Sequence, residues 1–482
     1  MGASRCCRRL RWLLLALGLC RGARAQSSPQ AELSCLLASG DVLGADDAGP
    51  VEPPPWQDLA SLRRGDESRA RLALSTSQPG FLPGVTTSAL LRVELGLNGL
   101  GTNTPALRDV SSWLAVSFQL APRAQVTLRA FPFDTDYVRL GYLHALDWGG
   151  TDAARSESIF LRQTGSVPGL QALLAVPRLR LFSALKWANV DDALQGRRRL
   201  WGVFSGGSVE LGPTLRVDGG FGYFQRPSGA PTPTIASSFV EGASLRVVWH
   251  RRVSEPELSA EPFRPPSLVE DPTRFDAEAT PGWAVAFEAV TLVQRLRRFE
   301  NPNRAALVPA PAAAVYGSAR ESSLAVHAAV TWRSLAFVLR NDARLASGET
   351  RPRSAGELAE LTAWLGASVT LRPSFLVPSC ELGLRLPAAM KTPSALAGFG
   401  QTFLAKGSTG LEALPIGAGR LPVASARLGA RFQASSHLAL SLFGEFARDP
   451  NRVRFSALPS GVARAFARAE RLALVVAAQA RF

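Results

Sequence analysis

The chain has 482 residues, a hydrophobic content of 46%, a mean hydropathy of +0.06 and a formal net charge of +15. No stretch beyond the N-terminal region reaches the roughly 18 uninterrupted apolar residues that a membrane-spanning helix needs, which argues against a helical membrane protein. The basic residues are scattered and form no Lys/Arg run with interleaved aromatic residues, which argues against nucleic-acid binding.

Residues 1–25 have the three parts of a secretory signal peptide. Arginines precede a short apolar run at 12–19, and a small-x-small cleavage site ends at Ala25. The apolar run is too short to cross a bilayer as a helix. The sequence therefore predicts an exported chain whose mature form begins near Gln26.

Residues 26–110 are predicted to form an extension ahead of the strand-rich region. The Pro-rich segment 51–55 indicates a stiff, extended break, and residues 61–67 are charged and poor in strand-forming side chains. The segment 89–97 does alternate between apolar and polar residues, and it predicts one possible extra strand within the extension.

From Ser111 onward, apolar residues recur at every second position with few interruptions. Examples are the segments 114–120, 179–187, 283–289, 324–333 and 438–446. Alternation of this kind predicts strands with one apolar and one polar face. The runs are near ten residues long, whereas strands of globular sandwiches usually have about 5–6.

The last stretch, 471–482, alternates in the same way and ends in Phe482. Its length matches a tilted strand that crosses a bilayer, which takes about 9–11 residues. This ending resembles the C-terminal signal of outer-membrane β-barrel proteins of double-membrane bacteria, a porin-like class. The resemblance implies a location in the bacterial outer membrane and recognition of the terminal strand by the barrel-assembly machinery. It also places the extension 26–110 in the periplasm.

Connection lengths support an antiparallel up-and-down barrel over 111–482. Counted back from Phe482, long external loops alternate with short periplasmic turns, as in barrels of this class. The count predicts about 16 strands, with 18 or 14 as alternatives. The connection 251–281 breaks the alternation, and two interpretations stay open: an inward-folded plug or a hidden strand.

Aromatic residues are predicted at the two membrane interfaces, where amphipathic rings collect. The residues expected at periplasmic strand ends are Trp249, Trp283, Trp332 and Phe482. Those expected at external ends are Trp187, Trp201 and Phe446.

The polar phase of the strands carries many basic residues. The predicted pore-lining set is Arg129, Arg139, Arg180, Lys186, Arg216, Arg246, Arg333, Arg427 and Arg431. A barrel of about 16 strands is wide enough to hold an aqueous channel, and rings of Arg or Lys favour anions. The sequence therefore predicts passive diffusion of small hydrophilic solutes with a lean towards anions.

Two other functions stay open. The arginines could pair with acids in a plugged lumen, which would leave a structural or binding barrel whose loops 388–423 and 448–470 engage a partner. A barrel enzyme acting on lipids through His144 or His327 is the weaker alternative, since no serine lies in a Gly-x-Ser-x-Gly motif. We expect no enzyme activity, no cofactor and no metal.

Cysteine usage and surface charge complete the prediction. Two cysteines, Cys35 and Cys380, follow the signal peptide, and the sequence does not decide whether they form a disulfide. No Cys/His spacing indicates a zinc site. The expected partners are outer-membrane lipids, lipopolysaccharide, the assembly machinery and small hydrophilic solutes.

Overall fold

The computed structural model describes residues 30–39, 66–80, 82–98, 106–109, 111–133, 135, 138–141, 143–144, 146, 167–192, 196–225, 235–251, 281–297, 305–334, 359–371, 375–393, 400–406, 410–435, 437–458 and 461–481. The predicted signal peptide, the connection 252–280 and Phe482 lie outside the described residues. No helix among these residues is long and apolar enough to cross a bilayer.

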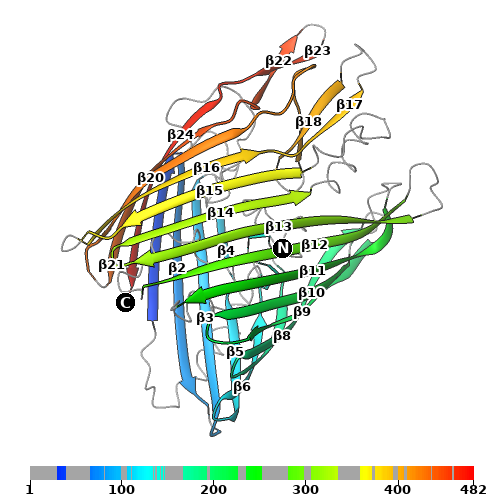
Figure 1. Cartoon of the computed structure of the whole chain (residues 1–482). Coiled ribbons are helices and arrows are strands. Elements are labelled where there is room, and N and C mark those ends of the chain that lie inside the picture. Colours follow the sequence, from blue (N-terminus) through cyan, green and yellow to red (C-terminus); the bar gives the residue numbers. More distant parts are fainter. Residues whose placement is uncertain are drawn as a thin grey trace.

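Eighteen antiparallel strands of the described chain form one closed wall (Figure 1). Successive wall strands pair with each other, and β1 pairs with both β2 and β24, which closes the barrel. The wall strands are β1 (Gln30–Ser39), β2 (Asp66–Pro79), β3 (Val85–Asn98), β5 (Trp113–Ala121), β6 (Ala124–Phe131), β7 (Gly169–Val176), β8 (Leu179–Asp192), β9 (Gly196–Glu210), β10 (Leu215–Gln225), β11 (Ile235–Arg251), β12 (Gly282–Arg297), β13 (Ala305–Glu321), β14 (Leu324–Ser334), β15 (Ala359–Val369), β16 (Leu376–Leu386), β20 (Val423–Gln433), β21 (Leu438–Arg448) and β24 (Glu470–Arg481). The short β4 (Ala106–Asp109) pairs with β3 beyond the end of β5, so β4 and β5 share one place in the wall.

The predicted all-β barrel is therefore confirmed, with 18 strands, one of the expected alternatives, rather than 16. The structure differs from the prediction in where the wall begins. β1, β2 and β3 are wall strands, so the wall starts at Gln30 and not near 111. The predicted extra strand at 89–97 lies within β3. β1 and β2 escaped detection because charged residues such as Glu32 and Arg71 interrupt their apolar pattern.

The positions of the strands also differ in the segment 295–346. The sequence patterns there suggested a long loop before a tight turn at Ser334. Instead, β13 fills 305–321 despite two prolines, and the tight turn to β14 is at 322–323, where Ser322 has a φ of 53°. β14 therefore runs in the direction opposite to the predicted one.

Connections at one end of the barrel are short, and most of those at the other end are long. We call the first end the short-turn rim; it holds 80–84, 122–123, 177–178, 211–214, 322–323, 370–375 and 434–437, together with the long connection 252–281. The second end, the long-loop rim, holds 40–65, 99–112, 132–168, 335–358, 387–422 and 449–469, together with three shorter connections. In bacterial outer-membrane barrels the long loops are external.

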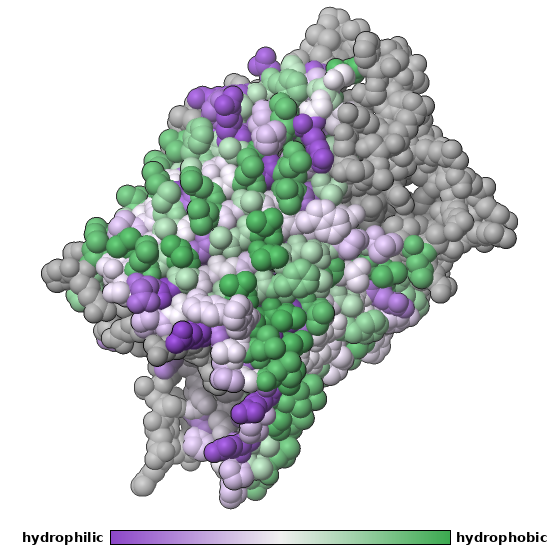
Figure 2. Space-filling view, in the orientation of Figure 1, coloured by the Kyte–Doolittle hydropathy of each residue, from purple (hydrophilic) through white to green (hydrophobic). Residues whose placement is uncertain are grey.

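The outward face of the wall is apolar between the two rims. Exposed outward residues include Leu365, Leu428 and Leu442, each more than half exposed. In Figure 2, hydrophobic residues form a band over the strands, and hydrophilic residues gather towards the two rims. Phe239 and Trp249 lie ten residues apart on the outward face of β11. At about 3.3 Å per residue and a tilt near 40°, they span about 25 Å, the height of the apolar band of a membrane barrel.

Two small sheets extend the wall at the long-loop rim. One contains β17 (Ala389–Pro393), β18 (Gly400–Lys406) and β19 (Gly410–Ala413), and the other is the hairpin of β22 (Val453–Leu458) and β23 (Gly461–Phe466). Val453 packs with Ala389, Leu404 and Leu414 in one apolar cluster. Asn451 joins the two loops further, because it accepts the Leu421 N–H and donates to the Leu421 carbonyl.

Candidate functional site in the barrel lumen

The lumen has an apolar side, formed by a cluster of inward residues on β8 to β13. Phe182, Phe204, Phe224, Val290 and Leu292 are buried there in one cluster. Inward residues of a water-filled barrel are normally polar, so an apolar inner wall needs another part of the chain to cover it. That cover comes from the connection between β6 and β7.

A short hairpin of this connection, which we call the lumen hairpin, covers residues 138–146. Leu140 and Leu146 exchange two backbone hydrogen bonds of 3.0 and 2.7 Å. Gly141 has a φ of +80°, and a Cβ there would lie 2.4 Å from the His144 carbonyl oxygen, so the turn requires glycine. Both leucines have no exposed surface and belong to the apolar cluster of the inner wall.

Two glycines of the wall make room for these leucines. A Cβ at Gly220 on β10 would lie 2.6 Å from Leu140 Cδ2, and one at Gly242 on β11 would lie 2.9 Å from Leu146 Cδ1. Any larger residue at either position would have to displace a leucine. The wall therefore carries a socket for each leucine of the lumen hairpin.

A buried carboxylate fixes the tip of the hairpin. Glu288 on β12 has no exposed surface, and it accepts the backbone N–H groups of Leu143 (3.0 Å) and His144 (3.3 Å). Hydrogen bonds from N–H groups to a charged acceptor are stronger than neutral ones. His144 Nε2 lies 3.2 Å from the Ala313 carbonyl oxygen on β13.

The environment of His144 keeps its ring neutral. Burial, followed by the positive charge of Arg333, lowers the pKa of His144 from 6.5 to about 3, although its hydrogen bond to the Ala313 carbonyl acts in the opposite direction. A neutral ring that donates from Nε2 carries no proton on Nδ1. His144 is thus a neutral contact of the hairpin with the wall.

The lumen also contains two triads in which one carboxylate joins two guanidinium groups, one on β10 and β11 beside the apolar cluster and one on β14 to β16. In the first, near the short-turn rim, Asp218 accepts Arg216 Nε (2.6 Å) and Arg246 Nε (2.7 Å). Arg246 Nη2 also contacts the same carboxylate, and Nη1 donates to the Tyr316 hydroxyl (3.1 Å). All three charged side chains are buried in the lumen.

The second triad lies at the long-loop rim. Glu360 lies near the start of β15. It accepts hydrogen bonds from Arg333 Nε on β14 (2.7 Å) and from Arg385 Nε on β16 (2.9 Å). Each triad carries two positive charges and one negative charge. Further carboxylates lie near the first triad, because Glu210 is 3.9 Å from Arg216 and Glu288 is opposite Arg246 in the sheet.

In a third cluster, one guanidinium group lies between two carboxylates. Arg427 on β20 lies between Glu381 (3.4 Å) on β16 and Glu445 (3.6 Å) on β21, and His327 Nε2 is 3.4 Å from Glu381. The Arg427 guanidinium also lies 4.0 Å from the ring centre of Phe443. Positive charge is therefore partly compensated here, so the lumen is not uniformly cationic.

The remaining predicted pore residues occupy several environments. Arg180 and Arg216 line a cavity of about 480 Å³ at the short-turn rim, together with Arg123, Arg178, His250 and Glu210. Arg129 lies over Trp113 and donates to Gln171 (3.2 Å). Lys186 is buried with its Nζ 5.0 Å from the Phe204 ring centre. Arg431 donates to Gln433 (3.1 Å) near the short-turn rim.

Arg139 was predicted to line the pore from a wall strand, but it lies on the lumen hairpin. Several charged residues of the lumen were missed by sequence reasoning. Arg71 and Glu94 form an inward ion pair (2.8 Å) between β2 and β3, in the region interpreted as an extension. Arg385 was detectable, because it alternates with the outward Leu382 and Leu384 on β16.

Most predicted interface aromatics lie at the expected ends of their strands. Trp249 and Trp283 meet edge to face (4.9 Å) at the short-turn rim, while Trp187, Trp201 and Phe446 lie towards the long-loop rim. Trp332 is outward, but it lies at the long-loop rim and not at the periplasmic end that was predicted. The reason is the reversed direction of β14. Phe482 lies outside the described residues.

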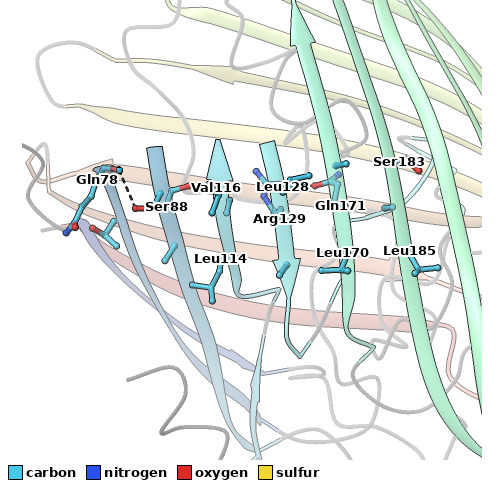
Figure 3. Close-up of a pocket in the computed structure, with 18 of the residues that line it drawn as sticks. Gln78, Ser88, Leu114, Val116, Leu128, Arg129, Leu170, Gln171, Ser183 and Leu185 are labelled. Atoms are coloured by element: carbon cyan, nitrogen blue, oxygen red, sulfur yellow. Dashed lines mark hydrogen bonds between the residues drawn. The ribbon is translucent and has the colours of Figure 1, made fainter. Parts of the chain in front are cut away.

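The outer wall over β2 to β9 has a shallow groove of about 800 Å³ (Figure 3). Its sides are two cross-strand rows of outward residues. One row contains Ala89, Leu114, Ala130, Leu170, Leu185 and Val203; the other contains Gln78, Thr87, Val116, Leu128, Ala172 and Ser183. Small residues within the rows leave the space of the groove. Because both rows face outward, the groove belongs to the outer surface and not to the lumen.

Cys35 and Cys380 are both free cysteines on the wall, so they do not form a disulfide with each other. Among the described residues, no group of three or more His, Cys, Asp or Glu side chains is arranged to hold a metal ion. His144 and His327 both contact wall residues, Ala313 and Glu381 respectively.

Comparisons with known proteins give fold likeness only. No protein-family model matches the chain, and no curated protein matches its sequence. The chain is similar to the solved structure of Pseudomonas aeruginosa OpdL, with 9% identity and a TM-score of 0.48 over 95% of this chain and 99% of that one. It is also similar to the P. aeruginosa outer membrane protein OpdK (11%, TM-score 0.45, 94% and 99%) and to the outer membrane channel DcaP of Acinetobacter baumannii (10%, TM-score 0.40, 96% and 99%).

Proposed function

We propose that the chain is a porin-like channel of a bacterial outer membrane, through which small hydrophilic solutes diffuse passively with a lean towards anions. The observation that carries this proposal is the pair of Arg–carboxylate–Arg triads that face the lumen at different heights. Glu360 lies near the long-loop rim and Asp218 near the short-turn rim. Buried triads cost desolvation energy, so their retention along an inner wall supports a role in attracting charge.

The proposed path passes from the long-loop rim to the short-turn rim. An anion entering from the external side first meets the triad of Arg333, Glu360 and Arg385. It then passes the lumen hairpin, which narrows the apolar side, and it leaves through the cationic cavity lined by Arg123, Arg178 and Arg180. The negative charge of Glu381 and Glu445 keeps the expected lean modest.

Single-channel recording of the refolded mature chain in a planar bilayer tests this proposal. We expect stable open steps and a reversal potential on the anion side in a salt gradient. Arg180→Glu and Arg431→Glu should each move that potential towards the cation side, because both side chains lie on the inward face. Arg454→Glu is the matched control, since Arg454 is exposed on the β22–β23 hairpin.

A second candidate function is supported by the lumen hairpin. The hairpin fills the apolar side with buried leucines, which fits a plugged structural or binding barrel as well as a constricted channel. A folded, heat-modifiable barrel without conductance would reject the channel and favour the plugged barrel. The described contacts of His144 and His327 with the wall support a structural role for both residues and give no support to lipid catalysis.

The proposed location requires export and assembly. We propose that residues 1–25 are cleaved as a signal peptide and that the assembly machinery recognises the terminal strand. β24 is suited to this because its outward residues, among them Leu474 and Val476, form one apolar face. Deletion of Phe482 should lower the amount of barrel in outer-membrane fractions. Equal amounts of the deleted and intact chains would contradict recognition through that residue.

A further inference from the structure

A third Arg–carboxylate–Arg group lies outside the lumen, on the outward face at the long-loop rim. Arg448 ends β21 and is paired across the sheet with Glu470, which begins β24. Arg448 Nε lies 3.7 Å from Glu470 Oε1, and Arg468 Nε lies 4.0 Å from Glu470 Oε2. We call Arg448, Arg468 and Glu470 the rim triad.

The rim triad differs from the lumen triads in exposure and in the length of its contacts. The side chains of Arg448, Arg468 and Glu470 are 66%, 41% and 40% exposed, whereas those of the Asp218 triad are nearly fully buried. Ion pairs this exposed and this long contribute little to stability. Internal stability is therefore a weak reason for two arginines to meet one carboxylate here.

The height of the rim triad on the wall places it at a membrane surface. Phe446 lies two residues before Arg448 on the same outward face and is 42% exposed. Because aromatic side chains mark the edge of the apolar band, the Arg448 guanidinium lies about 7 Å further along the strand, at the level of lipid headgroups.

The backbone that carries the rim triad is held in place by several hydrogen bonds. The Asp449 N–H donates to the Ala469 carbonyl (2.8 Å), and the Ala467 N–H donates to the Arg452 carbonyl (2.9 Å). Arg452, which is buried, donates from Nη1 to the Arg468 carbonyl (2.9 Å). The backbone positions from which Arg448 and Arg468 project are therefore fixed before a ligand binds, which lowers the part of the binding cost that comes from ordering the loop.

We propose that the rim triad binds the phosphate group of a phosphorylated lipid in the leaflet at the long-loop rim. Planar guanidinium groups match phosphate oxygens with paired N–H donors, and the exposed side chains of Arg448 and Arg468 flank one carboxylate at the membrane surface. This inference rests on the membrane location in the proposed function, but it does not depend on whether the channel conducts.

Binding of fluorescent diphosphoryl lipid A to the refolded mature chain in neutral detergent tests the proposal. Arg448→Ala/Arg468→Ala should weaken binding about tenfold or more, because it removes two charge-assisted contacts. Glu470→Gln should tighten binding about threefold or more, because it removes the carboxylate that competes with phosphate. A purely structural role for Glu470 predicts the opposite change. Removal of both phosphates from the lipid should abolish the difference between variants.

The matched control is Arg251→Ala. Arg251 is also an exposed arginine two residues beyond an interface aromatic, Trp249, but it lies at the short-turn rim without a triad. We expect its lipid affinity within twofold of the unmodified chain. A double variant that binds within twofold, or an equal loss in Arg251→Ala, would overturn the proposal. Heat-modifiable migration checks the fold, and conductance recorded without lipid A reports separately on the channel.

Discussion

The two sides of the lumen solve the same structural problem in opposite ways. An apolar cluster on the inward face of β8 to β13 is covered by the lumen hairpin, whereas charged inward residues on β10 and β11 and on β14 to β21 are satisfied by one another. The strands themselves alternate in the same manner on both sides. The side chain at an inward position thus depends on its surroundings, which are either another part of the chain or the open lumen.

The two sides also use glycine differently. On the apolar side, Gly220 and Gly242 leave space for leucines of the hairpin. On the charged side, Gly366 leaves space for the His327 ring, which a Cβ would approach to 2.3 Å. The first pair admits a distant segment of the chain, and the second admits a neighbouring side chain of the wall itself. The hairpin nevertheless reaches both sides, because Leu143 packs on the cluster that contains Ala329 on β14 and Trp364 on β15.

The largest expected effect is at the Asp218 triad, which lies on β10 and β11 beside the apolar cluster. Asp218→Ala would leave Arg216 and Arg246 buried without their shared carboxylate, and removal of one partner from a buried ion pair costs about 3–5 kcal/mol. Urea unfolding of the refolded barrel measures this loss. Glu210→Ala is the matched control, because Glu210 is 34% exposed and lies 3.9 Å from Arg216, and its loss should cost less than about 1 kcal/mol. Equal losses would mean that the triad contributes nothing beyond surface electrostatics.

The next largest effect is expected on the apolar side, where only the docking of the lumen hairpin should weaken. Leu140→Ala empties the socket at Gly220 and should weaken docking by about 2–5 kcal/mol, the usual cost of removing a buried leucine side chain. Hydrogen exchange of peptides covering 138–146 measures the opening. Leu143→Ala, at a partly buried position, should have a smaller effect. Unchanged protection in Leu140→Ala would show that the leucine does not hold the hairpin.

Glu288→Gln probes the point where the lumen hairpin meets the charged residues of the wall, since Glu288 accepts two N–H groups of the hairpin and lies opposite Arg246 in the sheet. The amide keeps one acceptor oxygen but loses the charge that binds two N–H groups, so docking should weaken by about 1–3 kcal/mol. Hydrogen exchange of the Leu143 and His144 amides reports the change. Glu241→Gln, exposed on the outward face of β11, is the control and should leave exchange unaltered.

Acidification should have the smallest and most gradual effect. The docked hairpin holds His144 with a pKa of about 3, against 6.5 when undocked, so only the undocked form takes up a proton between these values. Docking is therefore strongest above pH 6.5 and weakens by about 1.4 kcal/mol per unit as the pH falls towards 3. Arg333 and Arg246 face the same region and keep their charge, and Glu288 remains the acceptor of the His144 N–H.

Hydrogen exchange at pH 7.5 and 5.5 measures this effect. His144→Phe removes the titrating group, so its hairpin should show no added loss of protection at the lower pH once the intrinsic exchange rates are taken into account. An identical pH response in both chains would assign the effect to another group, with Glu288 the first to examine.

Much of the wall could be predicted from local alternation, because a strand buries or exposes side chains with a period of two. The outward Trp249 and the inward Arg246 were both placed correctly on β11 in this way. Strands whose inner face is charged, such as β2 with Arg71, or whose outer face carries prolines, such as β13, lack a clear period and were missed.

The lumen hairpin could not be predicted, because its contacts are distant in sequence. Glu288 and Leu143 are 145 positions apart, and no local pattern links them. Nothing in the sequence states which segment fills the space that Gly220 and Gly242 leave. Trp332 shows a different limit: its face was correct, while its end depended on the location of one tight turn.

The pairing of β1 with β24 constrains how the chain can fold. Glu32 is opposite Arg481, and Gln479 donates to Glu32 (2.7 Å) across 447 positions of sequence. Contacts between such remote positions form slowly, because the entropy of a very large loop must be lost before the pairing contributes. Until that last contact forms, two strands keep unpaired backbone groups that can pair with other chains. Pairing of β1 with β24 therefore also removes the two strand edges through which the chain could associate with other chains.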